Sequence, residues 1–193
     1  MKVGLNATCI SDRPSGAKQR FVGIYLNLVK QLQDVEFIIY EPIDSRPGNL
    51  FQNLKNIKIQ KTLIHSEDYF RKFASSVSYW NTILKNDNLD IFEIFNLPLY
   101  KNPKGKTFLT IHDLRGLYLK WNPIKKIIYK EALKRSVNSC DHIITVSYYM
   151  KKELTKLFPQ KKISVVYNGI NSFEYDKISE NDLNIFRQKY NIP

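Results

Sequence analysis

One histidine in this sequence stands where α/β proteins place ligand-binding groups. His112 directly follows Thr107–Ile111 (TFLTI), a β-branched and aromatic run that is typical of a buried strand. Open α/β sheets bind ligands beyond the carboxyl ends of their strands. An imidazole with an ordinary pKa of about 6.5 can exchange a proton or hydrogen-bond a hydroxyl at neutral pH. His112 is therefore our candidate catalytic residue, with Asp113 to orient it, although both residues can also simply cap the next segment.

A second group of candidates opens the first predicted helix. Apolar residues repeat at helical spacing from Phe21 to Leu32, shortly after a first strand at Lys2–Ala7. Gly16, Lys18 and Arg20 therefore fall at or near the helix N-terminus, where unpaired N–H groups and the helix dipole attract phosphate. The alternative is a plain β–α turn. Neither a GxGxxG pattern nor a P-loop is present, so a dinucleotide or ATP site is not supported.

The longest ordered pattern, at residues 140–171, predicts a strand, a helix and a second strand. His142–Val146 (HIITV) is a β-branched run, and Ser147 can cap a helix because its hydroxyl accepts from an unpaired backbone N–H. Pro159 ends that helix, and Ile163–Val166 (ISVV) forms the second strand. Parallel strands joined by a helix cross over in the right-handed sense, so this is one βαβ unit.

Strands and helices alternate along the whole chain. We expect further strands at Glu36–Tyr40, Ile57–Gln60 and Asp90–Phe95, and helices at Ser66–Lys85, Asn122–Asn138 and Asp182–Tyr190. About seven strands in this alternation indicate a Rossmann-like α/β fold: a doubly wound, mainly parallel sheet with helices on both faces. The carboxyl ends of such strands share one edge, which should bring together Gly16, His112, Ser147, Asn168 and Gly169.

The composition indicates one globular domain of a reducing compartment. The chain has 193 residues, of which 43% are hydrophobic, enough for one α/β domain with a sizeable core. Its two cysteines, Cys9 and Cys140, form neither a disulfide framework nor a zinc pattern, which favours the cytoplasm. The N-terminus is expected to be a strand and not a signal peptide, and no run approaches the roughly 18 apolar residues of a membrane span.

The charge balance favours anionic partners. The chain carries 30 Lys and Arg against 18 Asp and Glu, a net charge of +12. This excess suits nucleic acid, anionic lipid or phosphorylated substrates, unless it is only a solvated basic surface. No nucleic-acid reader motif is present, so nucleic acid is not expected, whereas an anionic membrane surface is a possible partner. The basic helix at Asn122–Asn138 either lies against a membrane or packs on the sheet through Ile124, Ile127, Ile128, Leu133 and Val137.

The segments CDHIITVS, FP and KISVVYNGI, in this order between Cys140 and Ile170, resemble a stretch of family 4 glycosyltransferases, which have the GT-B architecture. TIHD at residues 110–113 is similar to a segment at the same place in that family. The resemblance covers nearly all of this chain. It implies that residues 1–176 are the N-terminal, acceptor-side domain, and that residues 177–193 are a helix and linker leading toward a C-terminal donor-binding domain outside this sequence.

The resemblance implies an enzyme that transfers a hexose, with retention, from a nucleotide-sugar donor to a sugar or lipid-linked acceptor. The implied setting is synthesis of cell-surface polysaccharide or glycolipid. We expect a cytoplasmic protein, either free or bound peripherally to the inner face of the membrane. It implies no obligatory metal or other cofactor, because the nucleotide-sugar is a co-substrate. His112 is implied as the catalytic residue, and binding of substrate or donor phosphate is implied for Gly16, Lys18, Asp113, Ser147, Asn168 and Gly169.

Two positions depart from the family's pattern. Glu93 stands where the fourth strand of relatives commonly ends in His, and Ser15 precedes Gly16 where many relatives have two glycines. The acidic E-x7-E signature of the family's second domain is absent from this sequence. The chain alone is expected to be inactive, because charge on a departing diphosphate needs preorganised donors and cations. Two other hypotheses are a stand-alone Rossmann-like module that partners a separately encoded donor domain, and a nucleic-acid-binding α/β domain.

Overall fold

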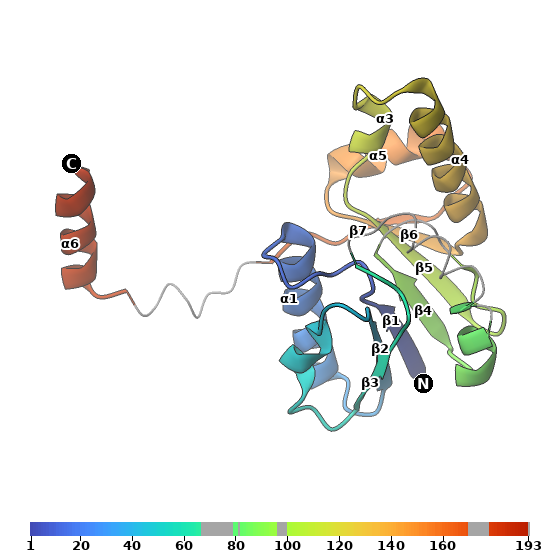
Figure 1. Cartoon of the computed structure of the whole chain (residues 1–193), viewed down its shortest axis with the longest axis horizontal. Helices are drawn as coiled ribbons and strands as arrows, with labels where there is room; N and C mark the ends of the chain where they lie inside the picture. Colours follow the sequence, from blue (N-terminus) through green and yellow to red (C-terminus); the bar gives the residue numbers. More distant parts are fainter. Residues whose placement is uncertain (67–78, 81, 96–99, 170–177, 193) are drawn as a thin grey trace.

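The computed structural model describes residues 1–66, 79–80, 82–95, 100–169 and 178–192. Within them, one sheet contains seven strands, and every neighbouring pair is parallel. The strands are β1 (Lys2–Asn6), β2 (Glu36–Glu41), β3 (Ile57–Lys61), β4 (Ile91–Ile94), β5 (Lys106–Ile111), β6 (His142–Thr145) and β7 (Ile163–Val165). Their spatial order is β3-β2-β1-β4-β5-β6-β7 (Figure 1). The sheet is doubly wound, so the predicted fold class is confirmed.

The described helices are α1 (Gly16–Gln31), the 3-10 helix η1 (Pro47–Phe51), α3 (Arg115–Tyr118), α4 (Pro123–Ser139), α5 (Tyr148–Leu157) and α6 (Glu180–Tyr190). The sequence did not predict η1 or α3, because each is too short to show a helical period. Of the predicted helix Ser66–Lys85, residues 67–78 and 81 lie outside the described part of the chain, whereas residues 79–80 and 82–87 are helical. The predicted domain boundary at residue 176 also lies outside it.

Apolar side chains cover both faces of the sheet. In β2, Phe37 and Ile39 belong to one buried cluster and the alternate residues Ile38 and Tyr40 belong to the other. The first cluster also contains Phe21, Tyr25 and Val29 of α1, and the second contains Leu133 and Val137 of α4 with Met150 and Leu154 of α5. Figure 1 accordingly shows α1 on one side of the sheet, and α4 and α5 on the other.

The structure confirms two predicted helix starts. The hydroxyl of Ser147 accepts from the N–H of Met150 at 3.2 Å and caps α5. The side-chain oxygen of Asn122 accepts from the N–H of Lys125 at 2.8 Å, and Pro123 is the first residue of α4. Each cap satisfies a backbone donor that the helix itself cannot pair, a contribution of about 1 kcal/mol.

The sequence predicted that five apolar residues of α4 could pack on the sheet, and this is wrong for the first three. Leu133 and Val137 are buried, but Ile124, Ile127 and Ile128 are 69%, 65% and 60% exposed and belong to neither buried cluster. The reason is length. The 17 residues of α4 span about 25 Å, whereas β5 and β6, with six and four residues, span about 20 Å and 13 Å. The sheet is therefore too short to cover the whole helix.

Candidate functional site

The candidate site lies at the carboxyl edge of the sheet, where the strand order reverses between β1 and β4. Loops that leave neighbouring strands for opposite faces open a crevice at such a point, and α/β proteins bind ligands there. The first turns of α1 follow β1 on this edge, and His112 follows β5 at once. The sheet therefore fixes the backbone on both sides of this switch point.

Arg20 connects two distant parts of this edge. It lies in the second turn of α1, is 5% exposed, and donates from Nη1 to Oδ1 of Asn168 at 2.7 Å. Asn168 belongs to the segment after β7, which Figure 1 shows running back past α1. Burial lowers the pKa of Arg20, against the opposing effects of Tyr25 and Glu93. Its Nε is buried and has no hydrogen-bond partner among the described residues, so the guanidinium keeps an unused donor.

Glu93 lies within β4 and is buried against α1. Its carboxylate accepts from the hydroxyl of Thr110 at 2.6 Å and from the hydroxyl of Tyr25. Burial raises the pKa of Glu93, although these two hydrogen bonds and the charge of Arg20 lower it. Burial and the neighbouring Glu93 raise the pKa of Tyr25 well above its ordinary value. This chain thus holds a buried carboxyl group between α1, β4 and β5.

His112 is half-buried beside this group. Its ring centre lies 5.9 Å from that of Phe95, which also packs against the rings of Phe21 and Tyr25. Burial lowers the pKa of His112 and the charge of Arg20 lowers it further, while Asp113 opposes them. The imidazole is therefore neutral at neutral pH. Its Nε2 is buried and unpaired within the described ranges, a position that costs about 1–3 kcal/mol unless a ligand supplies the partner.

Gly16 and Lys18 lie at the N-terminus of α1, as predicted. Ser15 caps the helix by accepting from the N–H of Lys18 at 3.1 Å, and Nζ of Lys18 donates to the carbonyl of Asp12 at 3.0 Å. A Cβ added to Gly16 would meet no atom within 4 Å. The space beside the helix N-terminus is therefore open, and it can admit a ligand.

The other predicted residues bond mainly within their own loops. Asp113 accepts from the N–H of Arg115 at 2.9 Å and pairs with its guanidinium at 3.8 Å, which holds the start of α3. The hydroxyl of Ser147 is used in the cap of α5. Gly169 is exposed beside Asn168, with open space where its Cβ would lie. Arg20 thus joins α1 to Asn168 by a hydrogen bond, and both Arg20 and Asp113 act on His112 through their charges. Ser147 has no described hydrogen bond to this cluster.

Sequence reasoning placed Arg20 near the helix N-terminus and noted Glu93 as a departure from the family, but it missed Tyr25 and the cluster that the three residues form. A signal for the cluster was present. Arg20 lies one helical turn before Ile24, so it falls on the apolar stripe of the helix. Glu93 interrupts the otherwise apolar run IFEIF of a buried strand. Charged residues are seldom buried without a partner. A buried Arg20 therefore indicates a nearby acidic group, and a buried Glu93 indicates a nearby cation.

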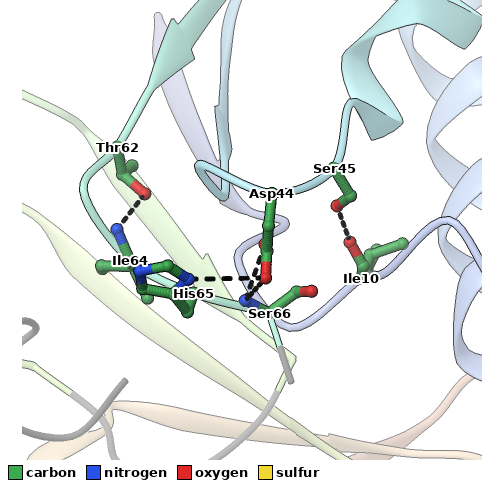
Figure 2. Close-up of polar contacts among 7 residues, drawn as sticks. All are labelled: Ile10, Asp44, Ser45, Thr62, Ile64, His65 and Ser66. Atoms are coloured by element: carbon green, nitrogen blue, oxygen red, sulfur yellow. Dashed lines mark hydrogen bonds and ion pairs between the residues drawn. The ribbon is translucent and has the colours of Figure 1, made fainter. Parts of the chain in front are cut away.

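A second hollow, of about 370 Å³, lies at the carboxyl end of β2 and is lined by Asp12, Ile43, Asp44, Ser45, Arg46 and Asn49. Figure 2 shows Asp44 accepting from the N–H of Ser66 at 2.9 Å and lying 3.7 Å from Nδ1 of His65. Burial raises the pKa of Asp44, but the hydrogen bonds from Ser66 and from its own backbone, with the charge of His65, together hold the pKa below its usual value. Ser45 donates to the carbonyl of Ile10 at 2.5 Å. The hollow is thus a polar pocket with a fixed backbone.

No group of three or more His, Cys, Asp or Glu in the described ranges is placed to hold a metal ion. In that same part of the chain, no helix combines the length and the apolarity needed to cross a membrane.

A family model and two similar proteins were found for this chain. The model of Glycosyltransferase Family 4 matches residues 15–172. The O-antigen chain mannosyltransferase RfbU of Salmonella typhimurium is 32% identical over 112 residues, which are 54% of this chain and 31% of the relative. A glycosyltransferase structure from Rickettsia africae superposes with a TM-score of 0.53 at 18% identity, over 100% of this chain and 50% of that one. The chain therefore spans half or less of the length of these relatives. The family match covers most of the residues described above, and the chain belongs to glycosyltransferase family 4.

Proposed function

We propose that this chain is the acceptor-side part of a GT-B enzyme that transfers a hexose, with retention, from a nucleotide-sugar donor. The acceptor is a growing cell-surface polysaccharide or a lipid-linked sugar. Mannose is the first sugar to test, because the relative RfbU is named an O-antigen chain mannosyltransferase. In this proposal the reaction takes place in the cytoplasm, at the inner face of the membrane. The proposal needs no metal or other cofactor besides the nucleotide-sugar.

The observation that carries this proposal is the unpaired, buried Nε2 of His112 at the switch point of the sheet. A sugar hydroxyl can both donate and accept, so it can satisfy this nitrogen in either tautomer of the neutral ring. Arg20 keeps a positive charge near the imidazole and thereby opposes its protonation. The hydrogen bond that His112 offers is therefore that of a neutral imidazole, which suits a hydroxyl better than an anion.

The donor half of the site has to come from elsewhere. Transfer from a nucleotide-sugar places negative charge on the departing diphosphate, which needs several preorganised donors or cations. At the edge described here, the open N-terminus of α1 beside Gly16 can offer backbone N–H groups, and Lys18 lies close by. These groups are too few for the reaction. A second, donor-binding domain, either in the same protein or separately encoded, is therefore part of the proposal.

The test is the variant His112→Ala in the complete enzyme. We expect kcat/KM to fall about 100-fold or more, the range for a positioned acid–base group. The matched control is His142→Ala, because that histidine sits on β6 and bonds the hydroxyl of Ser164 away from the edge. Normal activity of the His112 variant, with an unchanged far-UV circular dichroism spectrum, would overturn the proposal.

A further inference from the structure

The surface of α3, α4 and the turn between them exposes large apolar side chains. They are Tyr118, Leu119, Trp121, Ile124, Ile127 and Ile128, with exposed fractions from 39% to 70%. We call these six residues the α3–α4 apolar surface. Single exposed apolar residues are normal on proteins, but six within eleven consecutive positions form a patch, and such patches mark interaction sites.

The same segment is strongly basic. Between residues 118 and 135 there are six cations, Lys120, Lys125, Lys126, Lys130, Lys134 and Arg135, and one carboxylate, Glu131. That carboxylate is already paired with Arg135 at 2.9 Å. The apolar side chains are thus surrounded by positive charge that the segment itself does not neutralise.

The α3–α4 apolar surface lies toward the edge that carries the candidate site. α4 connects the carboxyl end of β5 to the amino end of β6, so it runs antiparallel to both strands. Its first turns, which hold the exposed isoleucines, are therefore on the His112 side of the sheet. Only nine residues separate His112 from Trp121.

We propose that the α3–α4 apolar surface docks onto an anionic lipid bilayer, with the isoleucines and Trp121 entering the headgroup region and the lysines contacting lipid phosphates. Charge decides between the candidate occupants. A second copy of this chain would bring the same cations into contact, which is repulsive, whereas an anionic bilayer is complementary in both charge and polarity. The purpose of docking, delivery of a lipid-linked acceptor to the site, rests on the proposed function. Docking itself does not.

This mode of binding differs from a purely electrostatic one. Ion pairs with lipid weaken as salt shortens the Debye length from about 8 Å at physiological strength to about 3 Å at 1 M. Burial of the isoleucines does not weaken in the same way. Binding should therefore need anionic lipid to form, yet persist in part at high salt.

The test is co-sedimentation of the 193-residue chain with vesicles of phosphatidylcholine, with and without phosphatidylglycerol. We expect binding only to the anionic vesicles. Ile124→Asn/Ile127→Asn/Ile128→Asn should abolish the binding that remains at high salt. Lys125→Glu/Lys126→Glu/Lys130→Glu should weaken binding at low salt about 10-fold or more, since each lysine near an anionic surface contributes. None of these six side chains belongs to a buried cluster, so the variants should fold.

Matched controls are available at the opposite end of the sheet. Leu50 and Leu63 are 51% and 68% exposed, and Lys55, Lys58 and Lys61 are exposed near β3. Changing these leucines to Asn, or these lysines to Glu, should leave vesicle binding unchanged.

Equal loss in the controls, or equal binding by both vesicle types, would overturn the proposal. A concentration-dependent dimer that the isoleucine variant abolishes, seen by analytical ultracentrifugation without vesicle binding, would assign the surface to a second copy. None of these outcomes tests the proposed function. That function is tested separately, by turnover of a soluble acceptor and by the loss of this turnover in His112→Ala.

Discussion

The side chains of Arg20 and Asn168 form a hydrogen bond of 2.7 Å although 148 residues separate them in the chain. The bond holds the segment after β7 against the second turn of α1. It also places a buried cation near Glu93 and His112, because the charge of Arg20 affects the pKa of both. One arginine therefore holds the backbone of the edge and, besides burial, helps to lower the pKa of its candidate catalytic residue.

Replacing Arg20 by Met should raise the pKa of His112, because the nearby positive charge disfavours the imidazolium and Met removes it. The pKa should stay below that of a solvated histidine, since burial, the larger cause, remains. The measurement is an NMR titration of the imidazole C–H signals of the 193-residue chain. Lys18→Met serves as the control, because it removes a cation from the same helix that is not among the causes of the shift. An unchanged pKa in Arg20→Met would disprove the coupling.

Glu93→Gln should change how stability depends on pH. In the unfolded chain a glutamate ionises at about pH 4.3, whereas burial raises its pKa in the folded chain. Between these two values the folded state binds more protons, so the contribution of Glu93 falls as pH rises through this window. Glutamine does not titrate, and the variant should lack this fall. Urea unfolding at a series of pH values measures it, with the exposed Glu131→Gln as the control. If the free energy of unfolding depended on pH in the same way in the native chain and in Glu93→Gln, burial would not raise the pKa of Glu93.

Two substitutions on α4 should differ sharply in their effect on stability. Leu133 is 3% exposed in the core, so Leu133→Ala should lower the free energy of unfolding by about 2–5 kcal/mol. Ile127 is 65% exposed, so Ile127→Ala should change it by about 0.5 kcal/mol or less. Thermal or urea unfolding of the two variants makes the comparison. Similar losses in both would mean that the first half of α4 is packed in solution.

The 193-residue chain alone should bind nucleotides weakly. The edge described here offers few groups for a diphosphate, so we expect a Kd above about 1 mM for a nucleoside diphosphate, or less than about 4 kcal/mol of binding free energy. Isothermal titration calorimetry can measure this, and the same sample should show no sugar transfer. Micromolar binding or measurable turnover would contradict the assignment of donor binding to a second domain.

The fold was predictable because its signals are local. Runs such as HIITV and TFLTI are β-branched and end at polar residues, so they define strands and also place His112 at a strand end. The resemblance around residues 140–170 was confirmed by a family match over residues 15–172. The roles of the individual edge residues stay predictions.

What could not be predicted depends on lengths and distances that a local pattern does not contain. Helical spacing shows that Ile124, Ile127 and Leu133 belong to one helix, but not that the sheet ends before it reaches the first two. The bond between Arg20 and Asn168 forms only because the chain returns across the sheet edge after β7. No sequence motif predicts this return. Glu93 was visible as a departure from the family, yet its partners Tyr25 and Thr110 come from two other elements.

The strand order has a consequence for how the chain folds as it is synthesised. β1 pairs with β2 on one side, but its other side pairs with β4, where the backbone of Asp90 donates to the carbonyl of Lys2 at 3.0 Å. A ribosome that adds about 5–20 residues per second therefore leaves one edge of β1 without its partner for several seconds. The pairs within β1–β3 and within β4–β7 join nearer segments, so each half can form before the two meet. We expect the closure between β1 and β4 to limit the folding rate, and the β1 edge to be the part of the nascent chain most open to misassociation until then.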